Sequence, residues 1–124
     1  MDCIFCKIIK GEMPSKIIYE DDQIIVFMDI NPSVDGHCLL VPKKHYTDYT
    51  ELDDDILTHM HKVQQKIADM LMNKLNVSAI SFAMNYGDSQ AVKHVHQHLL
   101  PNLLIKTKPE RTIEEIYEIL KPDN

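Results

Sequence analysis

The stretch His94-Val95-His96-Gln97-His98-Leu99-Leu100 places three of the seven histidines of this 124-residue chain within five positions. It reads as part of a strand over 93–100, in which successive side chains alternate between the two faces. The three imidazoles would then project from one face, about 6.6 Å apart per step. Burying three polar rings requires three sets of hydrogen-bond partners, so we expect a metal ion or an anion over this face.

The histidine strand by itself leaves two kinds of site open. A His-x-His strand can hold a catalytic zinc ion, with a third ligand elsewhere and an open position for water. An anion site instead uses imidazoles as hydrogen-bond donors and leaves one ring free to attack phosphorus as a nucleophile. The spacing of the three histidines does not choose between these sites.

Length and composition limit the class of protein. An apolar share of 44% and a charged share of 26% are ordinary for a folded domain and exclude a disordered chain. With 13 Lys and Arg against 19 Asp and Glu, the net charge is −6, which disfavours general nucleic-acid binding. No apolar run is long enough to span a bilayer, and the N-terminus does not resemble a signal peptide. We expect one cytoplasmic domain over 1–124, with neither membrane nor nucleic acid as a partner.

Hydrophobic periodicity and turn residues predict the elements on either side of the histidines. Hairpins dominate and only one long crossover is expected, which indicates an α+β protein with an antiparallel five-stranded sheet. The predicted helices cover 2–10, 51–75 and 113 to about 120. The predicted strands cover 16–19, 23–28, 37–41, 78–85 and 93–100.

The long predicted helix carries an apolar stripe and two cap signals are present in the chain. Thr50 with Asp53, and Thr112 with Glu115, have the spacing of capping boxes at the starts of the second and third helices. His59 and His61 do not share a helix face, and we expect both to be exposed. The stripe, with spacings of three or four residues, consists of Ile56, Met60, Val63, Ile67, Leu71 and Leu75.

Three cysteines are an odd number, so a disulfide framework is not expected. Cys38 lies in an apolar run and is predicted to pack in the core. Cys3 and Cys6 form a C-x-x-C pair. From the residues alone this pair is half a metal site, a redox pair or two small buried apolar residues.

Four ordered motifs together resemble the histidine triad (HIT) superfamily, in its Hint-like bacterial branch. The stretch from His94 follows the pattern H-φ-H-φ-H-φ-φ, and Gly36-His37-Cys38-Leu39-Leu40-Val41-Pro42-Lys43-Lys44-His45 resembles a second family segment. Residues 3–9 and 27–32 match as well, so the resemblance covers 2 to about 101 and leaves 102–124 as a C-terminal extension with a short helix. The resemblance implies a HIT-like fold and a two-fold homodimer, for which the apolar stripe and the open sheet edge offer surface.

The resemblance also implies an activity. Family members cleave at the α-phosphate of nucleotide conjugates, such as phosphoramidates or dinucleoside polyphosphates, through a nucleotidyl-histidine intermediate. The middle histidine, His96, corresponds to the nucleophile, with the carbonyl of His98 as the expected acceptor for its other nitrogen. The His98 side chain would donate to the phosphate, and His37 resembles the relay histidine behind the nucleophile. With His94, these three residues form the expected catalytic set.

A purine nucleotide is the ligand that the resemblance implies. Asp29 matches the acid that binds both ribose hydroxyls, and Asn85 the amide that contacts phosphate. Gln90 lies in the phosphate loop, which is two residues shorter here than in the family. His96 and His98 complete the expected nucleotide contacts, and the purine slot would be lined by Phe5, Ile8, Phe27 and Ile30.

In some bacterial members the C-x-x-C pair, a later histidine and the first triad histidine bind zinc. The corresponding residues here are Cys3, Cys6, His45 and His94. A closed set of two thiolates and two imidazoles leaves no position for water, so this zinc would be structural, and no catalytic metal is expected. Two alternatives stay open: a purine-nucleotide binding module with little turnover, and a zinc-dependent hydrolase that uses His94 and His96.

Overall fold

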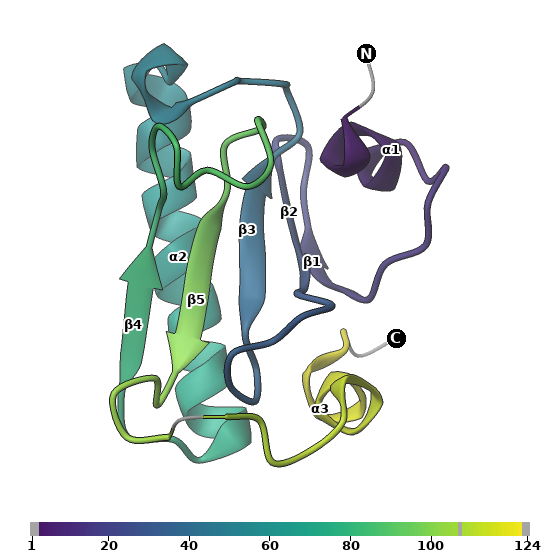
Figure 1. Cartoon of the computed structure of the whole chain (residues 1–124), viewed down its shortest axis with the longest axis vertical. Coiled ribbons are helices and arrows are strands. Elements are labelled where there is room, and N and C mark those ends of the chain that lie inside the picture. Colours follow the sequence, from purple (N-terminus) through teal and green to yellow (C-terminus); the bar gives the residue numbers. More distant parts are fainter. Residues whose placement is uncertain (1–2, 107, 123–124) are drawn as a thin grey trace.

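The computed structural model describes residues 3–106 and 108–122. Its centre is a five-stranded antiparallel sheet in the spatial order β1-β2-β3-β5-β4, which confirms the expected α+β fold (Figure 1). The strands are β1 (Ile17–Glu20), β2 (Ile24–Met28), β3 (Cys38–Pro42), β4 (Ile80–Ala83) and β5 (Gln97–Pro101). The helices are α1 (Ile4–Ile9), the 3-10 turn η1 (Tyr49–Glu51), α2 (Asp54–Leu75) and α3 (Ile113–Leu120).

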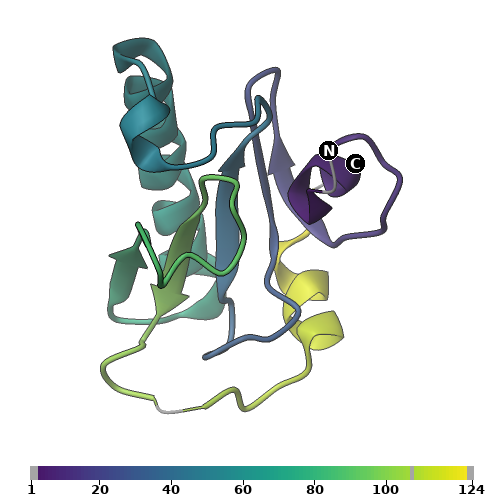
Figure 2. The same cartoon turned by 45° about the horizontal axis from the view of Figure 1, so that its top comes forward.

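The sheet separates two apolar clusters, because β2 and β3 are buried on both faces. Along β2, Ile24, Val26 and Met28 face the cluster under α2, whereas Ile25 and Phe27 face the cluster under α1. Figure 2 shows α1 and α2 on opposite sides of the sheet. This two-sided burial explains why both strands are continuous apolar runs rather than alternating ones.

The apolar stripe of α2 is confirmed, since all six of its side chains are buried. They pack against the chain's own sheet, so the stripe is not available as the dimer surface expected above. The predicted start of this helix was wrong. Asp53 caps α2 by accepting from the Ile56 N–H, while Thr50 belongs to η1, where Asp48 and Glu51 form the capping box. Within the described residues, no helix combines the length and apolar character needed to cross a bilayer.

The C-terminal extension folds back onto the α2 side of the sheet. Thr112 and Glu115 form the predicted capping box at the start of α3. Ile116 and Leu120 are buried in the same cluster as the α2 stripe. The extension therefore contributes to the core although the family motifs end before it.

The N-terminal helix is shorter than predicted. It starts at Ile4, with the Cys3 Sγ accepting from the Cys6 N–H, and position 2 lies outside the described residues. Phe5 and Ile8 are buried against the sheet, whereas Ile4 is exposed. Phe5 and Ile8 are three residues apart and share the helix face that meets the sheet.

The histidine segment joins the sheet later than predicted. Strand β5 begins at Gln97, which pairs with Leu40 at the end of the ladder between β3 and β5. The Val95 N–H instead donates to the Tyr46 carbonyl at 2.8 Å. The alternation of faces survives: Val95 and Leu99 lie in the α2 cluster, as expected.

His59, expected to be exposed, is half-buried and joins a polar cluster on the edge of α2. Its Nε2 lies 2.7 Å from the Asp21 carboxylate, which also accepts from the Tyr19 hydroxyl at 2.7 Å. Burial alone would raise the pKa of Asp21, but these hydrogen bonds and two backbone N–H groups lower it to about 2. The cluster ties the β1–β2 turn to α2.

Gly36 brings the turn before β3 against the end of α2. Its φ of +85° favours glycine, and a Cβ added there would lie 2.5 Å from Leu75 Cδ1 and 3.1 Å from Pro101 Cγ. The residue that follows is His37. Glycine at this position therefore lets the backbone next to His37 touch the last turn of the long helix.

Candidate functional site

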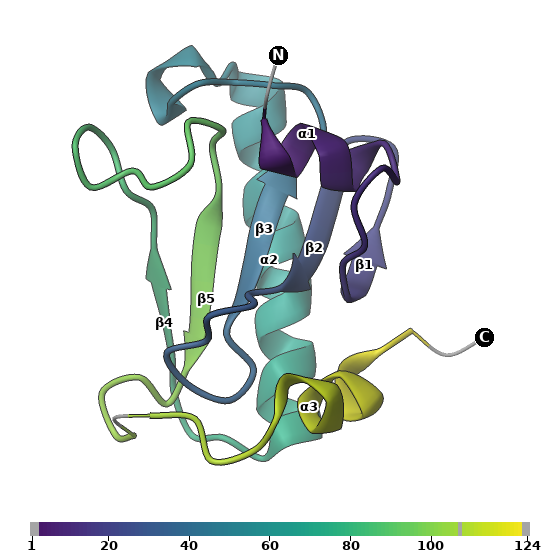
Figure 3. The ribbon, with the colours of Figure 1, turned by 45° about the vertical axis from the view of Figure 1, so that its right-hand side comes forward.

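A cavity of about 530 Å³ opens between α1, the loop after β2 and the loop after β4. Its volume is in the range of small-molecule sites. Figure 3 shows α1 over the sheet, the loop after β2 at the lower end of β3 and the loop after β4 at the upper end of β4 and β5. Nine of the residues predicted for catalysis or nucleotide binding line the cavity: Phe5, Ile8, Phe27, Asp29, Ile30, His37, Asn85, His96 and His98.

Two predicted residues lie elsewhere. Gln90 is buried, and its side-chain amide donates to the Thr47 carbonyl instead of lining the cavity. His94 faces the cysteines, as described below. Among the lining residues that sequence reasoning missed, Leu39 follows His37 by two positions on one face of β3, so strand alternation could have found it. Met13 and Ser33 come from loops and gave no periodic signal.

The His96 ring has a defined tautomer. Its Nδ1 lies 2.8 Å from the His94 carbonyl, so Nδ1 carries the proton and Nε2 keeps its lone pair. The acceptor was predicted to be the carbonyl of His98, which was wrong: the carbonyl two residues before His96 accepts, not the one two residues after it. Phe5 packs edge-on against the ring, with the centroids 5.0 Å apart. An imidazole held in this orientation presents Nε2, the ring nitrogen that can act as a nucleophile.

His37 and His98 form a hydrogen-bonded pair beside His96. The Ser33 N–H donates to His37 Nδ1 at 3.0 Å, so a neutral His37 carries its proton on Nε2. That Nε2 lies 2.8 Å from His98 Nδ1, which must then accept, leaving the His98 proton on Nε2. His37 therefore contacts His98, whereas the resemblance placed it behind the nucleophile. The chain of contacts leaves the His98 N–H free to donate to a bound anion.

Both rings of this pair are neutral at pH 7. Burial, and after it the neighbouring His37 and His96 rings, lowers the pKa of His98 to about 4. Burial also lowers the pKa of His37, against the opposing effect of the nearby Asp29 carboxylate. Asp29 Oδ2 lies 3.4 Å from His37 Nε2, and its Oδ1 accepts from the Asn31 N–H. Asp29 thus stands at the cavity wall with oxygen lone pairs left for a ligand.

A second cluster combines Cys3, Cys6, His45 and His94, whose four donor atoms lie within 4.8 Å of one another. Sulfur–nitrogen distances are 3.4 Å from Cys3 to His94, 3.3 Å from Cys6 to His45 and 3.6 Å from Cys6 to His94. Tetrahedral zinc with ordinary Zn–S and Zn–N bonds requires S···N separations of about 3.5 Å. The spacing of the donors therefore fits a tetrahedral zinc ion.

Hydrogen bonds around His94 prepare it for the same role. Its Nε2 lies 2.8 Å from the Pro42 carbonyl, so Nε2 carries the proton and Nδ1 presents its lone pair to the cysteines. Burial lowers the pKa of His94, which keeps the ring neutral. Burial and the Cys3 side chain raise the pKa of Cys6. The four residues that the family resemblance implied as zinc ligands thus lie together in the structure.

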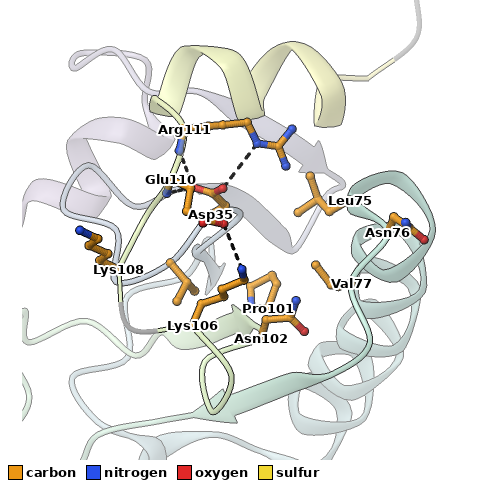
Figure 4. A pocket seen from close by; sticks show the side chains of 11 residues that line it. Asp35, Leu75, Asn76, Val77, Pro101, Asn102, Lys106, Lys108, Glu110 and Arg111 are labelled. Carbon is orange, nitrogen blue, oxygen red and sulfur yellow. Dashed lines mark hydrogen bonds and ion pairs between the residues drawn. The ribbon is translucent and has the colours of Figure 1, made fainter.

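A smaller hollow of about 180 Å³ lies at the far end of α2, beside the C-terminal extension (Figure 4). Four of its charged groups are paired with one another. The Asp35 carboxylate accepts from the Glu110 and Arg111 N–H groups and faces Arg111 Nε at 3.5 Å, while Lys106 Nζ lies 3.4 Å from Glu110. These contacts hold the extension to the turn before β3, so this hollow has a structural role.

Fold and site together define a class: an antiparallel α+β protein whose alternating histidines face a ligand-sized cavity. The HIT domain family model matches residues 10–103. The chain therefore belongs to the HIT family.

Relatives and solved structures agree with this assignment. An uncharacterized HIT-like protein of Methanocaldococcus jannaschii is 46% identical over 101 residues, 80% of this chain and 78% of that protein. A zinc-bound histidine triad family protein from Mycobacterium smegmatis superposes with a TM-score of 0.88 at 31% identity, covering 98% of this chain and 91% of the other. Adenylylsulfatase HINT3 of Arabidopsis thaliana is 33% identical over 81% of this chain and 52% of its own length.

Proposed function

We propose that this chain hydrolyses purine-nucleotide conjugates at the α-phosphate, through a nucleotidyl intermediate on His96. The observation that carries the proposal is the His96 ring itself: it lines the cavity, and the His94 carbonyl at 2.8 Å fixes the proton on Nδ1. The Nε2 lone pair is thereby available for attack on phosphorus. Phosphoramidates and dinucleoside polyphosphates both offer the required bond.

The reaction has two displacements. In the first, His96 Nε2 forms a bond to phosphorus, and the bond from phosphorus to the leaving group breaks with its electron pair going to the leaving atom, which takes a proton from solvent. In the second, a water oxygen forms a bond to phosphorus and loses a proton to solvent, while the bond from phosphorus to Nε2 breaks with its electron pair returning to Nε2. The His98 Nε2–H stabilises the charge that develops on phosphate oxygen in each step. His37 holds that ring in the donating tautomer.

The rest of the cavity suits a nucleoside. Phe5, Ile8 and Phe27 supply an apolar slot on the β2 side, and their rings and alkyl groups also belong to the cluster under α1. Asp29 has oxygen atoms for the two ribose hydroxyls, which need adjacent acceptors. Asn85 stands on the opposite side of the histidines, where its amide would contact phosphate.

Names of similar proteins support a hydrolase. One relative is called an adenylylsulfatase, and a solved structure from Legionella pneumophila, 34% identical with a TM-score of 0.71, is called a HIT family hydrolase. The name adenylylsulfatase implies a substrate with a bond between an adenylyl phosphorus and a leaving group, which is the bond type proposed here.

The test is intact-mass spectrometry after mixing the protein with adenosine 5′-phosphoramidate and quenching with acid-free denaturant. We expect product formation and an adenylyl adduct on the peptide that contains His96. Binding without turnover or adduct would support a nucleotide-binding module instead. Turnover that is abolished by a chelator while the fold survives would support a zinc-dependent hydrolase.

We propose further that Cys3, Cys6, His45 and His94 bind a structural zinc ion. The support is the fit of the four donors to tetrahedral geometry, together with the zinc-bound relative from Mycobacterium smegmatis. When bound, zinc cross-links α1 to the histidine segment. All four ligands come from the protein, so no position is left for a reactive water. Metal analysis of protein purified without chelator should give one zinc per chain.

A two-fold homodimer is the assembly we propose. Strand β4 is at the sheet edge, so its outer backbone groups have no partner strand in the sheet, and Phe82 on this strand is 45% exposed. Such an edge is a template for pairing with a second copy. Analytical ultracentrifugation should show twice the 14.4 kDa chain mass at micromolar concentration. A monomer under these conditions would contradict the proposal.

A further inference from the structure

Helix α1 contributes residues to both sites. Cys3, which caps the helix, and Cys6 in its first turn belong to the cluster of sulfur and nitrogen donors. Phe5 and Ile8 of the same helix line the large cavity. Because one helix of six residues carries all of these side chains or is capped by them, a movement of the helix shifts both sites at once.

Few contacts hold α1 in place. Within the described part of the chain, the hydrogen bonds that join residues 3–12 to other segments all involve the two cysteine sulfurs, which face His45 and His94. The remaining attachment is apolar, through the cluster that Phe5 and Ile8 share with β2 and β3. A helix of six residues is not stable by itself. Its position therefore depends on what occupies the two sites that it borders.

The Phe5 ring connects the two sites. Its centroid lies 5.9 Å from the ring of His94 in the cysteine cluster and 5.0 Å from the ring of His96 in the cavity. Its third aromatic neighbour is Phe27, at 5.5 Å on the cavity wall. All three contacts are edge to face, which restricts the orientation of the rings as well as their distance. A shift of Phe5 at the cysteine end of the helix therefore also changes the wall of the cavity.

A second cavity, of about 490 Å³, reaches the cysteine cluster from outside the first. Two members of the cluster, Cys3 and His45, line it. Three residues border both cavities and form the boundary between them: Ile4, Ala91 and Val92. A metal ion can thus reach the cluster without passing through the large cavity. The occupants of the two sites can therefore be added and removed independently.

We propose that α1 couples the two sites, so that zinc at the cysteine cluster raises the affinity for a purine nucleotide and the nucleotide raises the affinity for zinc. The inference rests on the proposed function and zinc site, and goes beyond them by joining the two. Zinc ligation by the two cysteines favours the position of α1 in which Phe5 and Ile8 contact the sheet. A nucleoside held between these side chains and Phe27 favours the same position. Two ligands that select one position of a shared element bind cooperatively, by an equal factor in both directions.

The test measures binding, with zinc alone and AMP alone as probes. Calorimetry gives the Kd of AMP for the zinc-loaded and the zinc-free protein, and competition with a chromogenic chelator gives the Kd of zinc with and without AMP. We expect zinc to tighten AMP binding about tenfold, within the usual range of coupling between sites, and AMP to tighten zinc binding by the same factor. Hydrogen exchange of the α1 amides should slow with either probe. Zinc removal should raise KM but leave kcat at saturating substrate unchanged.

Phe5→Leu is the decisive variant, because it keeps an apolar side chain on α1 but removes the ring that meets His94 and His96. The coupling factor should fall close to one. The factor is a ratio, so a loss of AMP affinity that is common to the zinc-loaded and zinc-free forms cancels. Phe27→Leu is the matched control: it changes the same slot from the β2 side and should keep a factor of about ten.

The outcomes separate this inference from the proposed function. Coupling in a protein without turnover supports the inference and contradicts the hydrolase. An AMP affinity independent of zinc, or an equal factor in Phe5→Leu and wild type, overturns the inference while leaving the hydrolase intact. If the zinc-free protein unfolds, the zinc Kd of both proteins with and without AMP still decides, since an equal effect of AMP in the two overturns the inference. Failure to bind zinc or AMP overturns it as well.

Discussion

The segment from His94 to His98 contributes side chains to two sites that differ in their other residues and in their exposure to the cavity. At one end, His94 joins two cysteines and His45 in a closed set of nitrogen and sulfur donors. At the other, His98 joins His37 and Asp29 at a cavity wall. His96 lies between them, held by the His94 carbonyl. A spacing of two residues thus places three identical side chains in three different surroundings.

The difference between the two sites lies in what surrounds each ring. His94 points its lone pair at two sulfur atoms, with its N–H satisfied by the Pro42 carbonyl. His98 has its lone pair satisfied by His37, with its N–H directed to the cavity. Both rings carry the proton on Nε2, so the partners of the two nitrogens, and not the tautomer, distinguish them. The Pro42 carbonyl sets the His94 tautomer, whereas His37, itself oriented by the Ser33 N–H, sets that of His98.

The largest expected effect is at the centre of the segment. His96→Ala should lower turnover of adenosine 5′-phosphoramidate by roughly 10³ to 10⁶, because no other group can form the bond to phosphorus. Nucleotide affinity, measured by calorimetry, should stay within a few-fold. His61→Ala, which removes an exposed histidine of α2, is the control. It should keep both the turnover and the nucleotide affinity of the wild type. Turnover of His96→Ala near the wild-type rate would refute the mechanism.

His98→Ala should have a smaller effect on the same reaction. Loss of one donor to developing charge lowers kcat by about 10²–10³. His37→Ala should fall in the same direction, since it frees the His98 ring to adopt the other tautomer. Steady-state kinetics of the single and double variants measure the coupling. Fully additive losses would contradict the hydrogen-bonded pair.

The other end of the segment should respond in stability rather than in chemistry. Zinc removal, or Cys3→Ser with Cys6→Ser, should lower the melting temperature by about 10 °C, because the ion binds only the folded chain. Turnover per folded molecule should persist. Scanning calorimetry with and without chelator measures the shift. Cys38→Ala, which removes a core thiol outside the cluster, should keep its response to chelator.

The smallest effect is a change in the pH dependence of stability. The pKa of His98 is about 4 in the folded chain against 6.5 for an ordinary histidine, so between these values the unfolded chain binds more protons. Stability should therefore fall as pH decreases from 6.5 toward 4. Urea unfolding at several pH values should show a shallower decrease in His98→Asn. Identical slopes for the two proteins would exclude this contribution.

Much of the architecture follows from periodicity. The α2 stripe and the two-sided apolar strands are long, regular signals, and burial reproduces them. The start of α2 was misplaced because Thr50 and Asp53 have capping-box spacing, whereas Asp48 competes for the turn before it. Strand β5 was predicted too long because the Val95 N–H donates to the carbonyl of Tyr46, distant in sequence, and the ladder with β3 starts only at Gln97. Cap choice and strand ends depend on partners that a local pattern does not include.

In the site, too, the positions of residues were easier to predict than the partners that they contact. Most residues assigned to the cavity by their motif positions do line it, since the motifs fix elements that pack together. The hydrogen-bond partners were less predictable. Which carbonyl accepts from His96, and which histidine contacts His37, depends on ring rotation set by Phe5 and Ser33. Gln90 was assigned to the ligand because it lies in the loop expected to contact phosphate, yet its amide donates to the Thr47 carbonyl.

Through Gly36, the long helix α2 constrains a cavity that it does not line. None of the residues lining the cavity belongs to α2. Yet Leu75, the last residue of α2, lies where a Gly36 Cβ would be, one position before His37. The length of the helix and the placement of that histidine are therefore mutually constrained. An insertion or deletion near the end of α2 should therefore also move His37 relative to the cavity. Differences in helix length between members of the family should accordingly be compared together with the positions of their histidines.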